Sequence, residues 1–184
     1  MDGLLIIDKP AGVTSFDVVR QLRRCCKTRK IGHAGTLDPL ATGVLPVAIG
    51  QATRLLEYLM AGEKVYQATL QLGVVTDTQD SEGRVIAEAD WRGATRDHLD
   101  VVCAALTGRI SQVPPMFSAI KQNGQPLYRL ARQGVEVERD AREVTIEAIE
   151  ILRFEPPEVD LRVTCSKGTY IRTLCHDIGA QLGC

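Results

Sequence analysis

Residues 31–43 read IGHAGTLDPLATG, and this stretch contains three glycines and the pair Asp38-Pro39. Such a composition is typical of neither a helix nor a paired strand, and the proline shifts the backbone of Asp38 away from the α region. We therefore expect a loop of one defined shape that presents His33 and Asp38 a few residues apart. A carboxylate in such a loop could cap a helix, bind a metal ion or attack an electrophilic carbon, and the pair alone leaves these alternatives open.

The chain around this loop has the composition of a globular protein. It has 184 residues, of which 45% are hydrophobic and 24% charged, so we expect one domain with a long inserted excursion. The net charge of −1 argues against non-specific binding of polyanions but leaves room for a local basic face. The sequence has no apolar run of about 18 residues and no leader with a cleavage site, so we expect a cytoplasmic protein that uses no membrane.

The hydrophobic pattern on both sides of the loop predicts a mixed α/β fold. Apolar or alternating runs predict strands at residues 4–7, 44–49, 64–72, 84–89, 144–154 and 159–165. Helices are predicted after the capping pair Thr14-Ser15 and at residues 52–60, 95–106, 126–132 and 169–182. Because strands and helices do not alternate regularly, we expect a mostly antiparallel sheet flanked by helices.

Two basic segments each have two interpretations. The far end of the first helix carries six cations within eleven residues, namely Arg20, Arg23, Arg24, Lys27, Arg29 and Lys30. They could form a solvated face at a helix C-terminus or a phosphate-binding patch, and their position directly before the loop favours the patch. Residues 110–142 interleave arginines with Phe117 and Tyr128, which suits RNA phosphates and unstacked bases. The alternative for that segment is a surface excursion with solvated charges.

Other chemistries find little support in the sequence. The six cysteines form no C-x-x-C pair and do not lie at zinc-ligand spacing from histidine, so reduced thiols and no metal site are predicted. Cys175 precedes His176, but adjacency in sequence is not the arrangement that nucleophilic catalysis needs. Asp77, Asp80 and Glu82 could indicate a calcium loop, yet their spacing departs from the EF-hand pattern and a polar turn explains them more simply.

The loop resembles the catalytic motif of the TruB-type tRNA pseudouridine synthases, in which a G-H-x-G-x-L-D-P-x-A-x-G string carries the essential aspartate. Further blocks resemble this family in the family's order, namely LIIDKPAGVTS at 5–15, KVY at 64–66, TDTQDSEG at 76–83, VPPMFSAIK at 113–121 and SKGTYIRTL at 166–174. The resemblance covers nearly the whole chain, with Ala34 standing where many relatives have threonine.

For the domain organisation, the resemblance implies a pseudouridine synthase fold in which residues 1–184 form the catalytic domain. Within it, residues 110–142 would be an inserted thumb that closes over RNA. Family members usually continue through more of the core and often into a small carboxy-terminal RNA-binding domain. The chain is therefore expected to be truncated and to lack that domain.

The resemblance also implies roles for site residues. Asp38 would be the catalytic residue, and Arg172 would keep its carboxylate ionised in a pocket whose burial opposes the charge. Tyr66 would stack on the flipped base, although a tyrosine in a strand ordinarily fills the core. Tyr170 would form a second wall of the pocket, and His33 would contact the displaced nucleotide.

Two further residues have supporting roles by the same resemblance. Lys9 and Pro10 would support the catalytic loop from behind, and Asp80 would be a second-tier substrate contact. The implied function is isomerisation of a specific uridine in the T-loop of tRNA to pseudouridine, by base flipping and an aspartate-dependent rearrangement of the glycosidic bond. This reaction involves no redox change, so no cofactor is expected. Whether Asp38 attacks the base, attacks the sugar carbon or removes a sugar proton stays open.

The expected partner is tRNA through its T-stem-loop, and we expect a monomer without an obligate protein partner. One competing hypothesis is a non-catalytic RNA-binding or RNA-folding protein that uses the same cleft. Another is the guide-RNA-dependent relative of archaea and eukaryotes, which shares the central motif. The thumb-like insertion and the bacterial-type flanking blocks favour the stand-alone enzyme.

Overall fold

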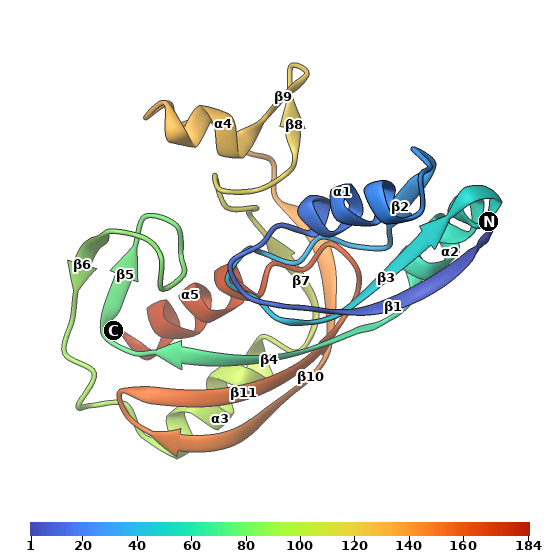
Figure 1. The fold of residues 1–184 in the computed structure, drawn as a ribbon. Coiled ribbons are helices and arrows are strands. Elements are labelled where there is room, and N and C mark those ends of the chain that lie inside the picture. The colour runs from blue at the N-terminus through green and yellow to red at the C-terminus, as the bar shows by residue number, and fades with distance from the viewer. The chain divides into compact units, whose positions relative to one another are not determined.

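The computed structural model describes residues 1–184 and divides them into two units (Figure 1). Unit 1 comprises Met1–Gly62 and unit 2 comprises Glu63–Cys184. Each unit has its own sheet and its own hydrophobic core. The organisation into one catalytic domain over residues 1–184 stays a prediction. None of the helices combines the length and apolar character that crossing a bilayer requires.

Unit 1 is a three-stranded antiparallel sheet covered by one helix. The strands lie in the order β1 (Gly3–Lys9), β3 (Gly43–Ile49) and β2 (Ile31–His33). Helix α1 (Ser15–Cys25) packs against them, and the shared core consists of Val18, Val19, Ile31, Leu45, Val47 and Ile49. The unit ends with the 3₁₀ helix η1 (Gly50–Leu55) and helix α2 (Leu56–Ala61). The predicted helix at 52–60 is thus split into two short helices.

The start of α1 follows the predicted capping chemistry. The Oγ1 atom of Thr14 accepts a hydrogen bond from the backbone N–H of Asp17 at 3.0 Å, and Oδ2 of Asp17 accepts one from the N–H of Thr14 at 2.9 Å. This reciprocal capping box satisfies two backbone donors that the first turn of a helix leaves unpaired. It fixes the start of α1, whose first residue, Ser15, is buried.

The prediction that residues 31–43 contain no paired strand is wrong at the first three residues and at Gly43, which begins β3 and pairs with Lys9. Ile31–His33 form β2, in which Ile31 pairs with Ile49 and His33 with Val47. Burial of the Ile31 side chain in the unit 1 core stabilises this pairing. A Cβ atom on Gly32 would lie 2.8 Å from Cδ1 of Leu56. The glycine therefore does not interrupt β2 but makes room for α2 to pack closely against it. Residues 34–42 contain no helix or strand, as predicted.

Unit 2 is built on a four-stranded antiparallel sheet. Its order is β4 (Lys64–Gln71), β11 (Glu158–Cys165), β10 (Arg142–Glu155) and β7 (Gly108–Gln112). In β11, Val159, Leu161, Val163 and Cys165 are all completely buried and alternate with partly exposed residues, which is the period-2 pattern of a half-buried strand. Because every strand pair in the chain is antiparallel, the predicted mixed α/β fold with a mostly antiparallel sheet is confirmed.

Two helices complete the core of unit 2. They are α3 (Arg96–Ala105) and α5 (Ile171–Leu182), and they contact each other. Leu99 and Val102 of α3 join Leu174 and Ile178 of α5 in one cluster with the inward side chains of the sheet. This packing places the first turn of α5, which carries Arg172, at a fixed position in unit 2.

The remaining elements of unit 2 are hairpins and a short helix. Strands β5 (Val74–Thr76) and β6 (Val85–Glu88) flank a polar turn. Between β7 and β10 lie only β8 (Lys121–Gln122), β9 (Gln125–Pro126) and α4 (Leu127–Arg132), which project away from the sheet in Figure 1. Asn123 and Gly124 connect β8 to β9 with φ values of 51° and 81°, the conformation that the predicted Asn-Gly turn requires. The first three residues of the predicted 110–142 insertion belong to β7.

Candidate functional site

A buried lysine holds the loop of Asp38 from behind. Lys9, at the end of β1, has no exposed surface, and its Nζ donates to the backbone oxygens of Pro10 at 2.8 Å, Val13 at 2.7 Å and Pro39 at 3.3 Å. An ammonium group has three donors, so all of them are directed at main-chain carbonyls. Burial lowers the pKa of Lys9, and the charge of Asp38 acts in the opposite direction. The support role of Lys9 stays a prediction, and these contacts are compatible with it.

A second contact fixes the other side of Asp38. The hydroxyl of Ser15, which is 1% exposed, accepts a hydrogen bond from the N–H of Leu37 at 2.9 Å and donates to the oxygen of Leu37 at 3.2 Å. The residues directly before and after Asp38 are thus both tied to the β1–α1 region. Asp38 is half-buried, and its backbone oxygen accepts from the N–H of Ala41 at 3.1 Å. Its position is set by contacts on the neighbouring backbone.

His33 lies at the end of β2, half-buried, at the entrance to the same loop. Burial lowers the pKa of its imidazole, and the nearby backbone of Gly35 only partly offsets this. The ring is therefore neutral at neutral pH. Its Nδ1 atom is buried without a hydrogen-bond partner. Buried polar atoms without partners are uncommon, so this nitrogen is a candidate for contact with a substrate.

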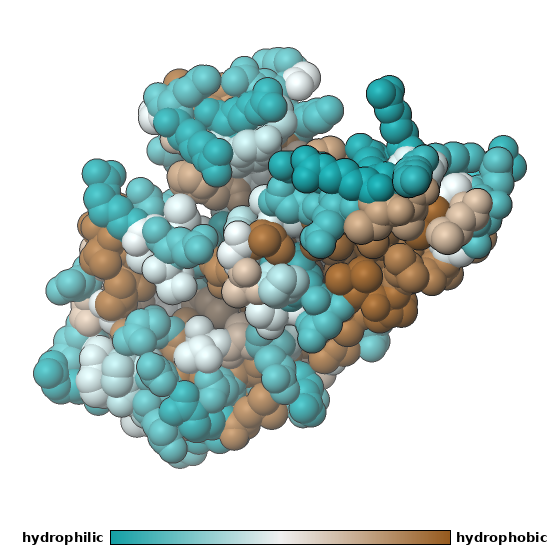
Figure 2. Space-filling view, in the orientation of Figure 1, coloured by the Kyte–Doolittle hydropathy of each residue, from teal (hydrophilic) through white to brown (hydrophobic).

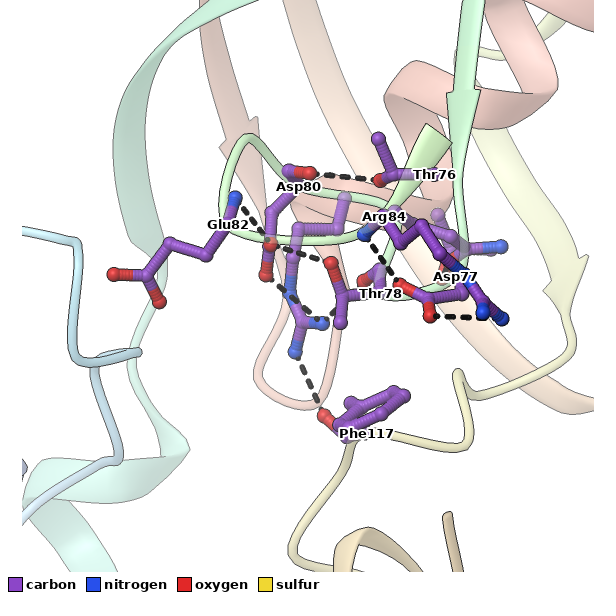
Figure 3. Close-up of polar contacts among 10 residues, drawn as sticks. Thr76, Asp77, Thr78, Asp80, Glu82, Arg84 and Phe117 are labelled. Atoms are coloured by element: carbon purple, nitrogen blue, oxygen red, sulfur yellow. Dashed lines mark hydrogen bonds and ion pairs between the residues drawn. The ribbon is translucent and has the colours of Figure 1, made fainter. Parts of the chain in front are cut away.

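In unit 2 the guanidinium of Arg172 joins three segments of the chain, and Figure 3 labels its partners Thr78, Asp80 and Phe117. It lies in the first turn of α5 with 13% of its side chain exposed, and donates to the backbone oxygens of Thr78 at 2.8 Å and Phe117 at 2.9 Å. One of its nitrogens is 3.5 Å from Oδ2 of Asp80, whose side chain is also 13% exposed. Two of the predicted site residues, Asp80 and Arg172, are therefore brought together as an ion pair.

The turn that carries Asp80 is held by its own hydrogen bonds (Figure 3). Oδ1 of Asp80 accepts from the hydroxyl of Thr78 at 2.6 Å and from the N–H of Glu82 at 3.1 Å. Oδ1 of Asp77 accepts from the N–H of Arg84 at 2.9 Å. The carboxylates thus bind groups of the turn itself, as the polar-turn interpretation expects. In residues 1–184, no group of three or more His, Cys, Asp or Glu side chains is arranged to hold a metal ion.

Tyr170 is the N-cap residue of α5, and a buried glutamine forms two hydrogen bonds with its backbone. Gln112, 2% exposed at the end of β7, accepts from the N–H of Tyr170 at 2.8 Å through Oε1 and donates to its oxygen at 3.1 Å through Nε2. Gln112 was not among the predicted site residues, because no strand was predicted at the position of β7. Ser15 was missed as well, since its role as a loop contact cannot be distinguished from helix capping in the sequence.

Tyr66 lies in β4 opposite Val163 and is half-buried against the unit 2 core. Its ring therefore contributes to packing and also has an exposed part, which is compatible with both interpretations of a strand tyrosine. The predicted residues divide between the units, with Lys9, His33 and Asp38 in unit 1 and Tyr66, Asp80, Tyr170 and Arg172 in unit 2.

The cysteines are unpaired thiols. Burial raises the pKa of Cys175 to about 12 and that of Cys103 to about 11. Both thiols remain protonated at neutral pH, and the thiolate is the nucleophilic form. The pair Cys175-His176 therefore lacks the electrostatic requirement for nucleophilic catalysis.

Comparison with known proteins agrees with the loop motif and the fold. A model of the TruB family pseudouridylate synthase N-terminal domain matches residues 23–171. The chain is 56% identical over all 184 residues to tRNA pseudouridine synthase B of Syntrophotalea carbinolica, covering 60% of it, and 52% identical to that of Clostridium acetobutylicum, covering 63%. It thus spans about 60% of the length of the curated relatives that it matches.

Among solved structures, the chain is similar to one in a Cbf5-Nop10-Gar1 complex, with a TM-score of 0.74 and 34% identity over 98% of this chain and 44% of the other. A second similar chain comes from an H/ACA RNP bound to a substrate RNA, with a TM-score of 0.69, 31% identity and coverage of 98% and 43%. These matches confirm the predicted pseudouridine synthase fold. The chain belongs to the TruB family of pseudouridylate synthases.

Proposed function

We propose that the whole protein isomerises a uridine in the T-loop of tRNA to pseudouridine, with Asp38 as the catalytic carboxylate. The observation that carries this proposal is the double anchorage of the Asp38 loop by Lys9 and Ser15. Anchored backbone on both sides of a half-buried carboxylate is the arrangement expected where a reactive group must be held in one geometry. The names of the relatives, which are tRNA pseudouridine synthases, support the reaction and the substrate class.

The proposed reaction breaks the bond between C1′ of the ribose and N1 of the base and forms a bond between C1′ and C5. The base loses the proton on C5 and gains one on N1, so no electrons enter or leave and no cofactor is needed. An ionised carboxylate can act as a nucleophile toward base or sugar, or as a base toward a sugar proton. Each of these routes requires Asp38 in its ionised form.

The other site residues receive their roles from the family resemblance. Tyr66 stacks on the flipped base, Tyr170 forms a second wall, and Arg172 favours the ionised state of Asp38 during the reaction. The burial of the Arg172 side chain supports its role, because a guanidinium away from water acts more strongly on other charges. Asp80 orients that guanidinium from a side chain that is equally buried.

His33 contacts the displaced nucleotide in this proposal. The buried Nδ1 atom without a partner supports the assignment, because a hydrogen-bonding group of the nucleotide would satisfy it. A neutral imidazole offers both a donor and an acceptor, which suits the edge of a base. Flipping the uridine costs on the order of a few kcal/mol, and such contacts repay part of that cost.

We further propose that the protein acts alone on the T-stem-loop, as a cytoplasmic monomer, with residues 110–142 as the thumb. The guide-dependent alternative is less well supported, because identity to relatives named tRNA pseudouridine synthase B reaches 56%, against 34% to the chain from the Cbf5-Nop10-Gar1 complex.

The test is release of tritium from C5 of uridine in a T-stem-loop RNA. The parent protein is expected to release it, and Asp38→Asn to release none while binding the RNA within a few-fold of the parent. Glu57→Gln removes one acidic side chain from α2 of the same unit and serves as the matched control with full activity. Turnover by Asp38→Asn, in protein freed of contaminating synthase, would contradict the proposal. Binding without any release by the parent would favour the non-catalytic alternative.

A further inference from the structure

A basic hollow lies at the carboxy-terminal end of α1 in unit 1. It has a volume of about 440 Å³ and is lined by Arg20, Arg23, Arg24, Lys27, Thr28 and Arg29. Five of these six residues are cations and none is an acid. Figure 2 shows strongly hydrophilic side chains over this part of the unit. The chain as a whole has a net charge of −1, so the hollow is a local concentration of positive charge.

A helix C-terminus explains only part of this cluster. Arg23 and Arg24 lie in the last turn of α1, where cations interact favourably with the helix dipole. Lys27 and Arg29 follow the helix, however, and Lys27 has a φ of 49°, a left-handed conformation that reverses the chain. The turn thus directs further cations to the hollow that the helix already lines. Without an anion nearby, this arrangement is electrostatically unfavourable.

Acidic side chains do not neutralise the hollow. Only Arg20 forms an ion pair, with Asp17, whereas Arg23, Arg24, Lys27 and Arg29 form none. Elsewhere the chain pairs its exposed arginines with acids, and examples are Arg92 with Asp90, Arg96 with Asp100, Arg153 with Asp160 and Arg162 with Glu150. A solvated mixed-charge face therefore does not describe this surface.

Arg23 holds its guanidinium in a fixed orientation at the hollow. It donates to the backbone oxygen of Ile31 at 3.1 Å and lies 5.5 Å from the centre of the Phe16 ring. Its Nε atom is buried without a hydrogen-bond partner. A guanidinium that is stacked and anchored loses little entropy on binding, and its planar donor fork matches the oxygens of a phosphate. The anchored guanidinium therefore suits an anionic ligand through its orientation and its charge.

We propose that this hollow binds backbone phosphates of the tRNA substrate, away from the reacting nucleotide. This proposal rests on the proposed function only for the identity of the RNA. Contacts between cations and phosphates set the register of a nucleic acid without reading its sequence. The hollow thus contributes affinity, whereas the Asp38 loop carries the chemistry.

The test removes two cations whose side chains form no hydrogen bond or ion pair within the protein. Arg24→Gln/Arg29→Gln removes two exposed charges from the hollow, and Arg92→Gln/Arg96→Gln removes two exposed, ion-paired charges from unit 2 as the matched control. Binding of fluorescent tRNA is measured from about 50 to about 400 mM KCl, because each phosphate contact adds about 0.7–0.9 to the slope of log affinity against log salt. Extrapolated from about 1 M to about 0.1 M salt, that slope means that each contact raises the affinity by about 5- to 8-fold.

We expect the hollow variant to lower the slope by about 1.4–1.8 and to weaken binding by about 25- to 60-fold at about 0.1 M salt. The control should stay within about 2-fold, with the slope of the parent. Equal slopes for the hollow variant and the parent would overturn the proposal, as would an equal loss in both variants. Inorganic phosphate is titrated in parallel, and tight binding of the free ion with an unchanged tRNA slope would assign the hollow to a small anion instead.

The same samples separate this proposal from the proposed function. Tritium release at saturating RNA reports the chemistry, and the salt slope reports the phosphate contacts. If the parent isomerises uridine but the hollow variant keeps the parental slope, only the phosphate site is wrong. If the parent binds tRNA with a slope that falls in the variant, yet never releases tritium, only the isomerase assignment is wrong.

Discussion

Replacing Gln112 by leucine should loosen the start of α5, because this buried side chain holds the backbone of Tyr170 by two hydrogen bonds. Leucine is close to glutamine in volume but can neither donate nor accept. The N–H of Tyr170 would lose its partner, which costs about 1–3 kcal/mol for a buried group. The oxygen of Tyr170 would keep its bond from the N–H of Leu174 at 3.0 Å and lose only its second donor, at about 0.5–1.5 kcal/mol.

The expected total is a loss of about 1.5–4.5 kcal/mol in the free energy of unfolding, measured by urea denaturation at neutral pH. The matched control is Gln71→Leu, which changes an exposed glutamine in β4 of the same sheet and should stay within about 0.5 kcal/mol. A midpoint for Gln112→Leu equal to that of the parent, with an unchanged slope, would refute the reasoning. An equal loss in the control would also refute it, because the effect would then follow from the residue type and not from the two hydrogen bonds to Tyr170.

Two further predictions concern unit 1. Lys9→Met should lower the free energy of unfolding by about 2–6 kcal/mol in urea, because the oxygens of Pro10 and Val13 lose their donor while that of Pro39 keeps a bond from Gly12 at 2.8 Å. A loss below about 1 kcal/mol would contradict this. The pKa of His33 is lowered in the folded protein from its ordinary 6.5, so the folded state binds fewer protons than the unfolded state just below that pH. Stability should therefore fall as the pH drops below about 6.5, and His33→Gln should flatten that dependence in denaturation series at several pH values. An identical slope in the variant would remove His33 as the cause.

The sequence predicted best those elements whose periodicity extends over several residues. The predicted strand at 144–154 lies within β10 (Arg142–Glu155), and the predicted helix at 95–106 contains α3 (Arg96–Ala105). The strands β2 and β5, with three residues each, are too short to display a period of two. Their pairing is decided by tertiary contacts such as the burial of Ile31, which no local pattern records.

The candidate site shows the same limit at the level of single residues. The glycine-rich composition of the loop marked His33 and Asp38, and the family resemblance supplied the rest of the set. Gln112 and Ser15 were not predicted because each binds the backbone of a residue far along the chain, 58 positions away for Tyr170 and 22 for Leu37. Every residue carries the same backbone groups, so the sequence does not indicate which distant backbone group a polar side chain binds. Only the fold reveals such contacts.

Three of the buried polar side chains share one physical role that bears on how such a site works. Lys9, Ser15 and Gln112 bind main-chain atoms, and they do so next to Asp38 and at Tyr170 without using the side chains of those two residues. Without these contacts, the glycine-containing loop around Asp38 would lose conformational entropy each time a substrate ordered it, at roughly 1–2 kcal/mol per residue. Contacts formed during folding remove that cost from the binding step. The free energy of RNA binding then remains available to draw the uridine out of its stack, which is the demand that the proposed reaction makes.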